Sequence, residues 1–183
     1  QIKTGYDFKG WYLDRAFAEG AQKSEVFSSD ATYGVIKLYA KWEPITYTVV
    51  FDGNSTDASS MASQEFKYDE SKALNQNTFV RTGYTFEGWA TSANSDVVAY
   101  NDQATVKELT ENNNATITLY AVWSENSYEL VLHSNYGTDS TSVKKLTYTE
   151  TVKLENPFAR TGYTFVGWNT KANETGISYE NNK

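Results

Sequence analysis

A nine-residue segment occurs twice in this chain almost unchanged and a third time in a looser form. Arg81–Trp89 reads RTGYTFEGW, Arg160–Trp168 reads RTGYTFVGW and Lys3–Trp11 reads KTGYDFKGW. The central glycine stands at positions 5, 83 and 162, so consecutive copies lie 78 and 79 residues apart. Internal repetition decides how many folding units a chain contains, so it has to be read before any local pattern. The chain is therefore predicted to be a tandem array.

A second motif sets the phase of the repeat. Leu38–Trp42 (LYAKW) returns as Leu119–Trp123 (LYAVW), and all five tryptophans of the chain lie in one of the two motifs. Four residues separate each LYAxW motif from a tyrosine-led run, Tyr47–Phe51 in one case and Tyr128–Leu132 in the other. One repeat therefore contains the tyrosine-led run, then GYxFxGW, then LYAxW.

This order divides the chain into three segments. We expect the C-terminal part of a truncated repeat at 1–44, one complete repeat at 45–124 and the N-terminal part of another truncated repeat at 125–183. Because no initiator methionine is present, we expect the chain to be a piece of a longer array. A solenoid repeat has only ~20–50 residues. Each complete repeat is instead predicted to be a small domain whose core supplies roughly 3–5 kcal/mol.

The predicted connections between the segments are short. Glu43–Thr46 reads EPIT and Ser124–Ser127 reads SENS, and neither contains glycine. Such connections limit domain motion more than a glycine/serine linker does. We therefore expect neighbouring repeats to hold a preferred relative orientation and the array to behave as a semi-rigid rod.

Composition excludes several classes of protein. The chain has 23 acidic and 16 basic residues and a net charge of −7, whereas a nucleic-acid-binding protein needs a basic face. No apolar run approaches the ~20 residues of a membrane span. The absence of cysteine excludes disulfides, thiol catalysis and cysteine-ligated metal. Aromatic residues make up 15% of the chain and supply large buried areas for small β domains.

The middle segment has the pattern of a mostly antiparallel sheet. Ile45, Tyr47, Val49 and Phe51 alternate onto one face, as in a half-buried strand. Further strands are expected at 64–68, 82–89 and 116–123, with Phe66 and Tyr68 pointing inward. A short helix is expected over 101–110, capped by Asn101 or Asp102, with Val106 and Leu109 on one face. This combination predicts an α+β, mostly β fold.

The parity of GYTFEGW leaves two possibilities for its tryptophan. Tyr84, Phe86 and Gly88 fall on one face of a regular strand, so Trp89 falls on the other. Either Trp89 packs against the opposite face, or a bulge at Gly88 returns it to the core. Residues that recur in every unit at strand spacing are those that separate cores require, and they are favoured over a sugar-stacking platform. The aromatic residues predicted to be core are Tyr84, Phe86, Trp89, Tyr120 and Trp123.

The two motifs, preceded by a YTVxFDGN-type strand, resemble the Listeria–Bacteroides repeat, also called the internalin B-repeat. The resemblance covers essentially the whole chain. It implies tandem small β-grasp (ubiquitin- or SUMO-like) domains in bacterial surface proteins, serving as stalk or adhesion modules. Asp52–Asn54 fits the first turn of the family, whereas His133–Asn135 in the last segment departs from it. The geometry of that turn is therefore open.

The search for reactive groups points away from catalysis. His133 is the only histidine, and we expect a solvated turn residue there, because a catalytic base needs a positioned partner. Asp52–Asp57 has oxygen ligands at alternating positions, but Ser63 stands where an EF-hand loop requires glutamate. An ordinary turn is expected. No catalytic, cofactor-binding or metal-binding residues are predicted, and no cofactor.

We therefore expect a non-enzymatic stalk or spacer of a bacterial cell-surface adhesin or internalin-like protein. It would be extracellular and attached to the cell wall through regions outside this chain. The alternative is an adhesion module that binds a host protein or glycan through the variable loops 56–64 and 90–100. Neither nucleic-acid binding nor a membrane span is expected. Because both end segments are incomplete repeats, we also expect self-association in which 125–183 of one copy pairs with 1–44 of the next.

Overall fold

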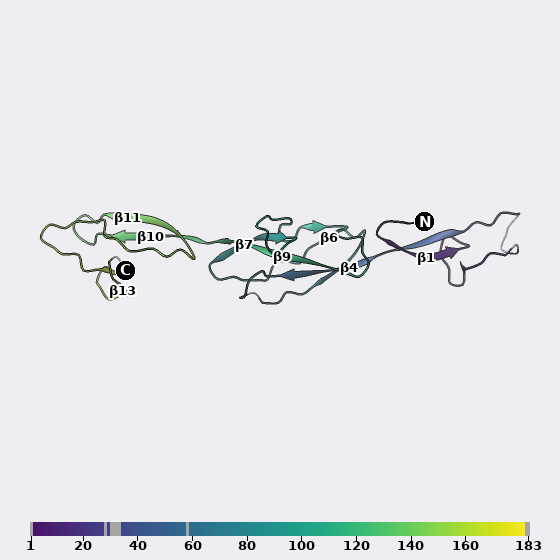
Figure 1. Ribbon diagram of the computed structural model, residues 1–183, viewed down its shortest axis with the longest axis horizontal. Helices are drawn as coiled ribbons and strands as arrows, with labels where there is room; N and C mark the ends of the chain where they lie inside the picture. The colour runs from purple at the N-terminus through teal and green to yellow at the C-terminus, as the bar shows by residue number, and fades with distance from the viewer. Residues whose placement is uncertain (1, 28, 30–33, 58, 182–183) are drawn as a thin grey trace. The chain divides into compact units, whose positions relative to one another are not determined.

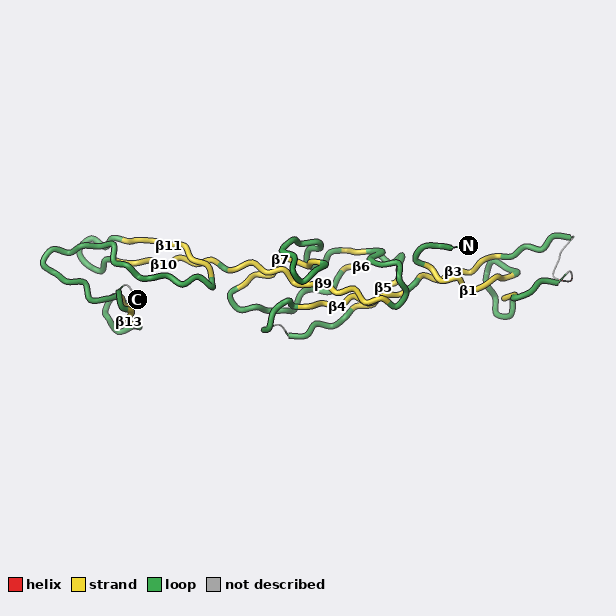
Figure 2. The backbone as a smooth tube through the Cα atoms, in the orientation of Figure 1, coloured by secondary structure: helices red, strands yellow, loops and turns green. Residues whose placement is uncertain are grey.

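The computed structural model describes residues 2–27, 29, 34–57 and 59–181. The chain forms two compact units, one comprising Gln1–Thr82 with Phe86–Trp123 and the other Gly83–Thr85 with Ser124–Lys183. Figure 1 labels several strands of each unit along the chain. No α-helix occurs among the described residues, and strands supply the regular structure (Figure 2). The expected mostly β character is confirmed. The described part of the chain has no helix long and apolar enough to cross a membrane.

A four-stranded mixed sheet forms the centre of the first unit. Its order is β5-β4-β9-β7, with bounds Gln64–Lys67, Thr46–Asp52, Ala115–Glu125 and Tyr84–Ala90. β4 and β5 are antiparallel, whereas β4 and β9 are parallel, with Tyr47 opposite Ala115 and Asp52 opposite Tyr120. All four strands predicted in the middle segment are present. The parallel pair was not expected, because sequence periodicity gives the face of a strand and not its neighbour.

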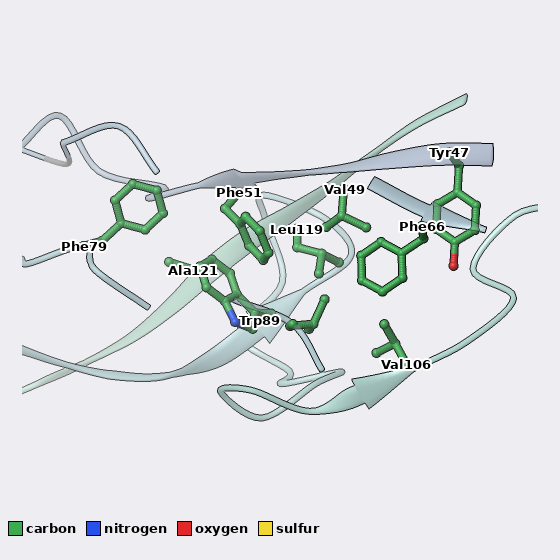
Figure 3. Packing of buried hydrophobic residues seen from close by; sticks show 10 residues of the cluster. Tyr47, Val49, Phe51, Phe66, Phe79, Trp89, Val106, Leu119 and Ala121 are labelled. Atoms are coloured by element: carbon green, nitrogen blue, oxygen red, sulfur yellow. The ribbon is translucent and has the colours of Figure 1, made fainter. Parts of the chain in front are cut away.

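The core lies on one face of this sheet (Figure 3). Tyr47, Val49 and Phe51 of β4 are buried, as the alternation predicted. Trp89 is fully buried, with its ring centroid 4.8 Å from that of Phe51. Burying one large apolar side chain contributes roughly 1.5–3 kcal/mol. The other buried members of the cluster are Phe66, Leu74, Phe79, Val106, Leu119 and Ala121.

A bulge explains how Trp89 reaches this core. The ring of Phe86 lies 4.9 Å from that of Trp89, although the two are three residues apart on one strand. Gly88 between them has φ +148°, and a β-carbon there would lie 2.8 Å from the Tyr100 carbonyl oxygen. In the equivalent strand β1, the pairing with β3 shifts register between Phe8 and Gly10. Of the two possibilities left open by parity, the core position of Trp89 is the correct one.

The predicted core aromatics differ in burial. Trp89 is buried, while Phe86 and Trp123 are half-buried and pack against the core cluster. Tyr84 and Tyr120 are also half-buried but do not belong to that cluster. The prediction that all five are core was therefore wrong for these two tyrosines. Tyr120 alternates with the buried Leu119 and Ala121, so it lies on the other face of β9.

The helix predicted over 101–110 is absent. Gln103 and Glu108 have φ of 58° and 56°, which no right-handed helix accommodates. Between them lies β8 (Thr105–Val106), which pairs with β6 (Lys72–Ala73). The two residues of β8 are β-branched and favour extended structure. Val106 is buried and Leu109 is half-buried, and both pack in or against the core cluster although the helix is absent.

The first segment adds a three-stranded antiparallel sheet to the same unit. Its order is β2-β1-β3, with bounds Gln22–Lys23, Tyr6–Tyr12 and Tyr39–Pro44. β1 carries the loose GYxFxGW copy, and β3 carries most of LYAKW. Phe8 packs edge-on against Trp11 and at a tilt against Trp42. The two motifs of a repeat are therefore neighbours in this sheet, as β7 and β9 are in the larger one.

The second unit is built on a hairpin of β10 (Ser127–His133) and β11 (Thr141–Thr147). A short antiparallel pair, β12 (Trp168–Asn169) and β13 (Ser178–Tyr179), follows. Leu146 of β11 is buried. Several large apolar side chains of this unit are exposed, among them Tyr163, Phe165 and Val166.

Candidate functional site

A set of backbone and aromatic contacts that the sequence did not predict lies where the first segment meets the middle one. The Ile45 N–H donates to the Gly5 carbonyl oxygen at 3.0 Å, and the Tyr68 N–H donates to the Ile45 carbonyl oxygen at 2.9 Å. The Tyr68 ring covers Gly5 so closely that a β-carbon on the glycine would lie 2.1 Å from it. We call this set of contacts the first joint. Ile45 at its centre is buried.

Side chains reinforce the first joint. The Tyr6 hydroxyl donates to Asp69 Oδ2 at 2.8 Å, and the Tyr6 and Tyr68 rings meet edge-on at 6.2 Å. The Asn113 amide donates to Asp7 Oδ2 at 2.8 Å. The hydrogen bond to Asp69 raises the pKa of Tyr6 above its ordinary value, because only the protonated phenol can donate to that carboxylate.

The second unit contains the same arrangement, which we call the second joint. The Asn126 N–H donates to the Gly83 carbonyl oxygen at 2.9 Å, and the Tyr148 N–H donates to the Asn126 carbonyl oxygen at 3.0 Å. A β-carbon on Gly83 would lie 2.1 Å from the Tyr148 ring. The rings of Tyr84 and Tyr148 meet edge-on at 6.0 Å. Tyr84, predicted to be core, belongs to this joint instead.

The carboxylate of the second joint comes from a different position. The Tyr84 hydroxyl donates to Glu125 Oε1 at 3.1 Å, and the Thr149 hydroxyl donates to the same oxygen at 2.7 Å. Thr149 occupies the place that Asp69 has in the first joint. Hydrogen bonds from Thr149, Thr147 and Tyr84 lower the pKa of Glu125, with Thr149 the largest cause. The Thr85 hydroxyl adds a hydrogen bond to Asn126 Oδ1 at 2.6 Å.

The turn after the first strand of each repeat is held by an asparagine. Asn54 has φ 49°, and its amide nitrogen lies 3.1 Å from each of the carbonyl oxygens of Ala93 and Ala121. Asp52 Oδ1 accepts from the Asn54 N–H at 2.7 Å. The turn therefore fixes the loop around Ala93 to the sheet.

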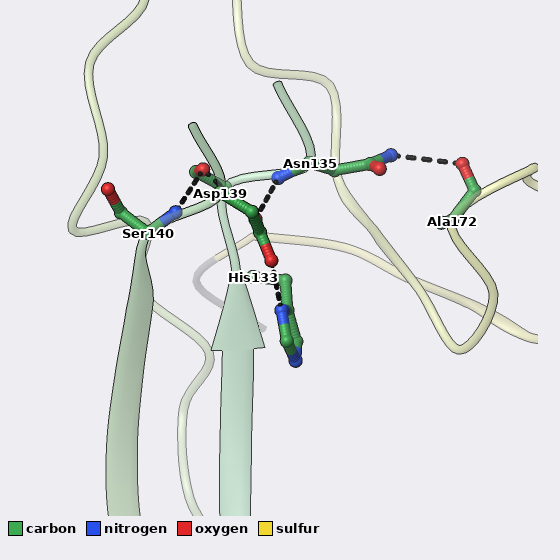
Figure 4. A network of polar contacts seen from close by, with 6 residues as sticks. His133, Asn135, Asp139, Ser140 and Ala172 are labelled. Atoms are coloured by element: carbon green, nitrogen blue, oxygen red, sulfur yellow. Dashed lines mark hydrogen bonds and ion pairs between the residues drawn. The ribbon is translucent and has the colours of Figure 1, made fainter. Parts of the chain in front are cut away.

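The last segment keeps this geometry despite its different sequence. Asn135 has φ 53°, and its amide donates to the Ala172 carbonyl oxygen at 3.0 Å (Figure 4). The carboxylate that accepts from the Asn135 N–H comes from Asp139, at 3.0 Å. The change from Asp52–Asn54 to His133–Asn135 therefore moves the carboxylate to another residue and preserves the turn.

His133 is a partner in that turn. Its Nδ1 lies 2.5 Å from Asp139 Oδ2, and both side chains are about half exposed. The hydrogen bond from His133 lowers the pKa of Asp139. Ser134 donates to Asp139 Oδ1 at 3.2 Å, so the serine hydroxyl is bound to the same carboxylate. The hydrogen bonds that His133, Ser134 and Asn135 make to the Asp139 carboxylate hold this turn together.

Local hydrogen bonds hold the turn at Asp52–Asp57. Ser55 Oγ accepts from the Asp57 N–H at 3.3 Å, and the Asp52 carboxylate accepts from the Asn54 N–H. No three histidine, aspartate or glutamate side chains gather in the described residues closely enough to hold a metal ion.

Sequence reasoning missed both joints, although a signal was present. Glycine precedes tyrosine in every copy of GYxFxGW, and Tyr68-Asp69-Glu70 returns as Tyr148-Thr149-Glu150. Neither pattern shows that the glycine of one segment is covered by the tyrosine of the next. That contact spans more than sixty positions, from Gly5 to Tyr68.

Comparison with known proteins agrees with the repeat pattern. The model of the Listeria-Bacteroides repeat domain family matches residues 1–41, 47–122 and 128–183. A protein of Evansella cellulosilytica named "Putative membrane protein" is 30% identical over 190 aligned residues, covering 97% of this chain and 25% of the relative. A second protein of that organism, "Putative Gly-rich membrane protein", is 34% identical over 169 residues, covering 91% of this chain and 18% of the relative.

The chain spans no more than a quarter of the length of either relative. No solved structure matches it. The family match accounts for all three segments, and its gaps fall close to the two joints. The chain belongs to the Listeria-Bacteroides repeat domain family.

Proposed function

We propose that this chain is part of a bacterial surface stalk, in which each repeat acts as a non-enzymatic spacer. The observation that carries the proposal is that the repeated residues serve structural ends. The tryptophan of GYTFEGW fills a core, the glycine and tyrosine form a joint, and the asparagine of the first turn fixes a loop. The names of the two relatives, both described as membrane proteins, support a location at the cell surface.

We also propose that each complete repeat is a β-grasp-like domain. The order β5-β4-β9-β7 places the first and last strands of the middle segment side by side and parallel at the centre of the sheet. That arrangement is the one expected of a β-grasp sheet. The described residues place no α-helix across it, so the likeness rests on the sheet alone.

Domain exchange in the full surface protein tests the spacer function. Residues 45–124 are replaced by an unrelated folded domain of similar length, and in a second variant they are deleted. A spacer predicts that exchange preserves the antibody accessibility of the distal domain on intact cells and that deletion reduces it.

The adhesion alternative predicts a different outcome of the same experiment. If loops 56–64 and 90–100 bind a host protein or glycan, exchange abolishes binding of the cells to an immobilised matrix or glycan panel. That loss, with accessibility of the distal domain unchanged, would overturn the spacer proposal.

A further inference from the structure

We infer that the Thr-Gly-Tyr turn of each GYxFxGW motif is a docking surface for the tyrosine turn of the following repeat, and that its glycine is the residue on which docking depends. The inference deepens the proposed spacer function and rests on it only for the biological use of the joint. The two halves of the contact are defined by the joints already described. The glycine turns are Thr4–Tyr6, Thr82–Tyr84 and Thr161–Tyr163, and the tyrosine turns are Tyr68–Glu70 and Tyr148–Glu150.

The backbone carries the contact, since the central side chain changes between the joints. Ile45 and Asn126 occupy the same place, yet each donates its N–H to the glycine carbonyl oxygen and accepts from the tyrosine N–H. A buried isoleucine and an amide have no side-chain chemistry in common. The constant features are therefore the glycine, the two backbone hydrogen bonds and the tyrosine ring.

The glycine is needed both for its backbone conformation and for its lack of a side chain. Gly5 and Gly83 have φ of +75° and +80°, a region that other residues rarely adopt. The Lys3 carbonyl accepts from the Tyr6 N–H at 3.0 Å, which closes a turn with glycine at its third position. In both joints the tyrosine ring lies where a β-carbon would be. Any larger residue would displace the ring.

The tyrosine turn is stiffened by its own glutamate. Glu70 Oε2 accepts from the Lys67 N–H at 3.1 Å, and the Glu70 N–H donates to the Lys67 carbonyl oxygen. Glu150 makes the corresponding pair of hydrogen bonds with Thr147. Each tyrosine is therefore presented on a turn whose shape is already fixed, which lowers the entropic cost of docking.

A carboxylate lies near the first tyrosine of each joint. Its presence in both joints indicates that the hydrogen bond from this tyrosine belongs to the contact. The first joint has Pro44 and Asp69, and the second has Glu125 and Thr149 at the equivalent positions. In each joint one acidic oxygen lies within hydrogen-bond distance of the tyrosine hydroxyl, supplied by Asp69 in the first joint and by Glu125 in the second. The tyrosine hydroxyl therefore has a carboxylate as its acceptor in both joints, although the two carboxylates come from different positions of the repeat.

The third glycine turn is an exposed copy of the same surface. Gly162 has φ +82°, and no described atom outside its chain neighbours lies within 4 Å of where its β-carbon would be. The Tyr163 N–H donates to the Arg160 carbonyl oxygen at 3.1 Å, as Tyr6 does to Lys3. Tyr163 is 66% exposed, and the Arg160 guanidinium lies over its ring at 3.6 Å. The turn is therefore preformed, and the chemistry it fits is a Tyr-x-Glu turn of another repeat of this kind.

Paired glycine substitutions test the inference in the 183-residue chain. Gly83→Ala and Gly162→Ala change the same motif at nearly the same φ, but only Gly83 is covered by a tyrosine ring. Gly5→Ala and Gly20→Ala form a second pair, matched in φ but not in motif, since Gly20 has φ +79° and open space. Amide hydrogen exchange is read at Asn126 and Tyr148 for the first pair, and at Ile45 and Tyr68 for the second.

Docking predicts that Gly83→Ala and Gly5→Ala lose exchange protection at those amides while Gly162→Ala and Gly20→Ala keep it. Protection in the core strand β4 for the Gly5 pair, and in the β10–β11 hairpin for the Gly83 pair, serves as the check that each variant folds. Equal loss in both members of a pair would show that the loss does not depend on the tyrosine ring over the glycine and would overturn the inference. So would unchanged protection in all four variants. Either result leaves the spacer proposal to be decided by the domain exchange.

Extension of the chain tests the exposed turn directly. Residues 105–150 of the same sequence are appended after residue 183, which supplies a further tyrosine turn at the natural spacing. Docking predicts that the α-proton resonances of Gly162 shift upfield through the ring current of the added tyrosine, and that changing this tyrosine to alanine abolishes the shift. Gly162 resonances that do not move in the extended chain would overturn the assignment of the third surface.

Discussion

Two aromatic residues of the same repeated motif make different kinds of contact. Trp89 fills the core beside Phe51 and Phe86, whereas Tyr84, five positions earlier, takes part in the second joint. Recurrence predicted that both residues matter to the structure but not which contact each makes. The difference arises from the bulge at Gly88 and from a partner, Tyr148, that lies far away in the sequence. Strand parity contains neither piece of information.

Trp89→Ala is expected to destabilise the first unit by about 3–5 kcal/mol, because it removes a fully buried ring and leaves a cavity. Tyr120→Ala, on the other face of the neighbouring strand, is the matched control and is expected to cost about 1 kcal/mol or less. Urea unfolding followed by far-ultraviolet circular dichroism measures both. Equal costs for the two variants would contradict the core assignment.

Glu125 should make the stability of the second unit depend on acid. Its pKa in the folded chain is lowered from the ordinary value of 4.5. Its contribution is therefore complete above that value and is lost as the pH falls through the lowered pKa. We expect the urea midpoint of this unit to fall on acidification, and Glu125→Gln to remove part of that dependence. Asp139→Asn is the comparison, because the pKa of Asp139 is also lowered. A Glu125→Gln profile parallel to that of the unchanged chain would refute the role of this carboxylate.

At the scale of strands and turns, alternation predicted the elements with regular periodicity and failed where the backbone leaves regular geometry. The strands at 46–52, 64–67, 84–90 and 115–125 follow from apolar alternation and β-branched or aromatic composition. The helix expected over 101–110 failed because Gln103 and Glu108 adopt positive φ, and because β8 finds its partner in β6. Such pairing is a tertiary effect, and it overrides a helical pattern only two turns long.

Asn54 illustrates how a turn can hold a loop that has no regular structure. Asn54→Ala is expected to destabilise the first unit by about 2–3 kcal/mol, since it removes two amide hydrogen bonds and places a less tolerant residue at positive φ. Asn54→Gly should cost less, because glycine keeps the backbone conformation. Urea unfolding and hydrogen exchange near Ala93 measure the effect. A glycine variant as unstable as the alanine variant would place the whole contribution in the side-chain hydrogen bonds.

For the whole molecule, the sequence predicted the number of repeats and their family, whereas only the structure shows the contacts between consecutive repeats. The family match to three stretches agrees with the spacing of the two motifs. The boundaries at 44 and 124 stay a prediction. The two compact units divide the chain differently, since Gly83–Thr85 belongs with the last segment. This division follows the second joint, in which Gly83 contacts Asn126 and Tyr148.

Self-association of two copies of the chain through their end segments stays a prediction. Among the described strands, β3 pairs only with β1, and β10 pairs only with β11. Their counterparts β9 and β4 are paired with one another in parallel. Open strand edges favour pairing with another chain, so β3 of one copy and β10 of the next are expected to pair in the same way. Sedimentation velocity should then show association that increases with concentration and is suppressed by Val131→Pro in β10. Sedimentation as a monomer at every concentration would refute the idea.

The maximum dimension of an array of such repeats depends on how firmly the joints hold consecutive repeats. A linker without restraint gives dimensions that grow roughly as the square root of its length. Here each joint has two backbone hydrogen bonds and a tyrosine ring over a glycine. We therefore expect the maximum dimension from X-ray scattering to grow almost linearly over chains of two, three and four repeats. The same chains with alanine at each joint glycine should fall towards square-root growth. If the unchanged chains already follow the square root, the joints do not restrain the array, and the stalk would have to derive any stiffness from elsewhere.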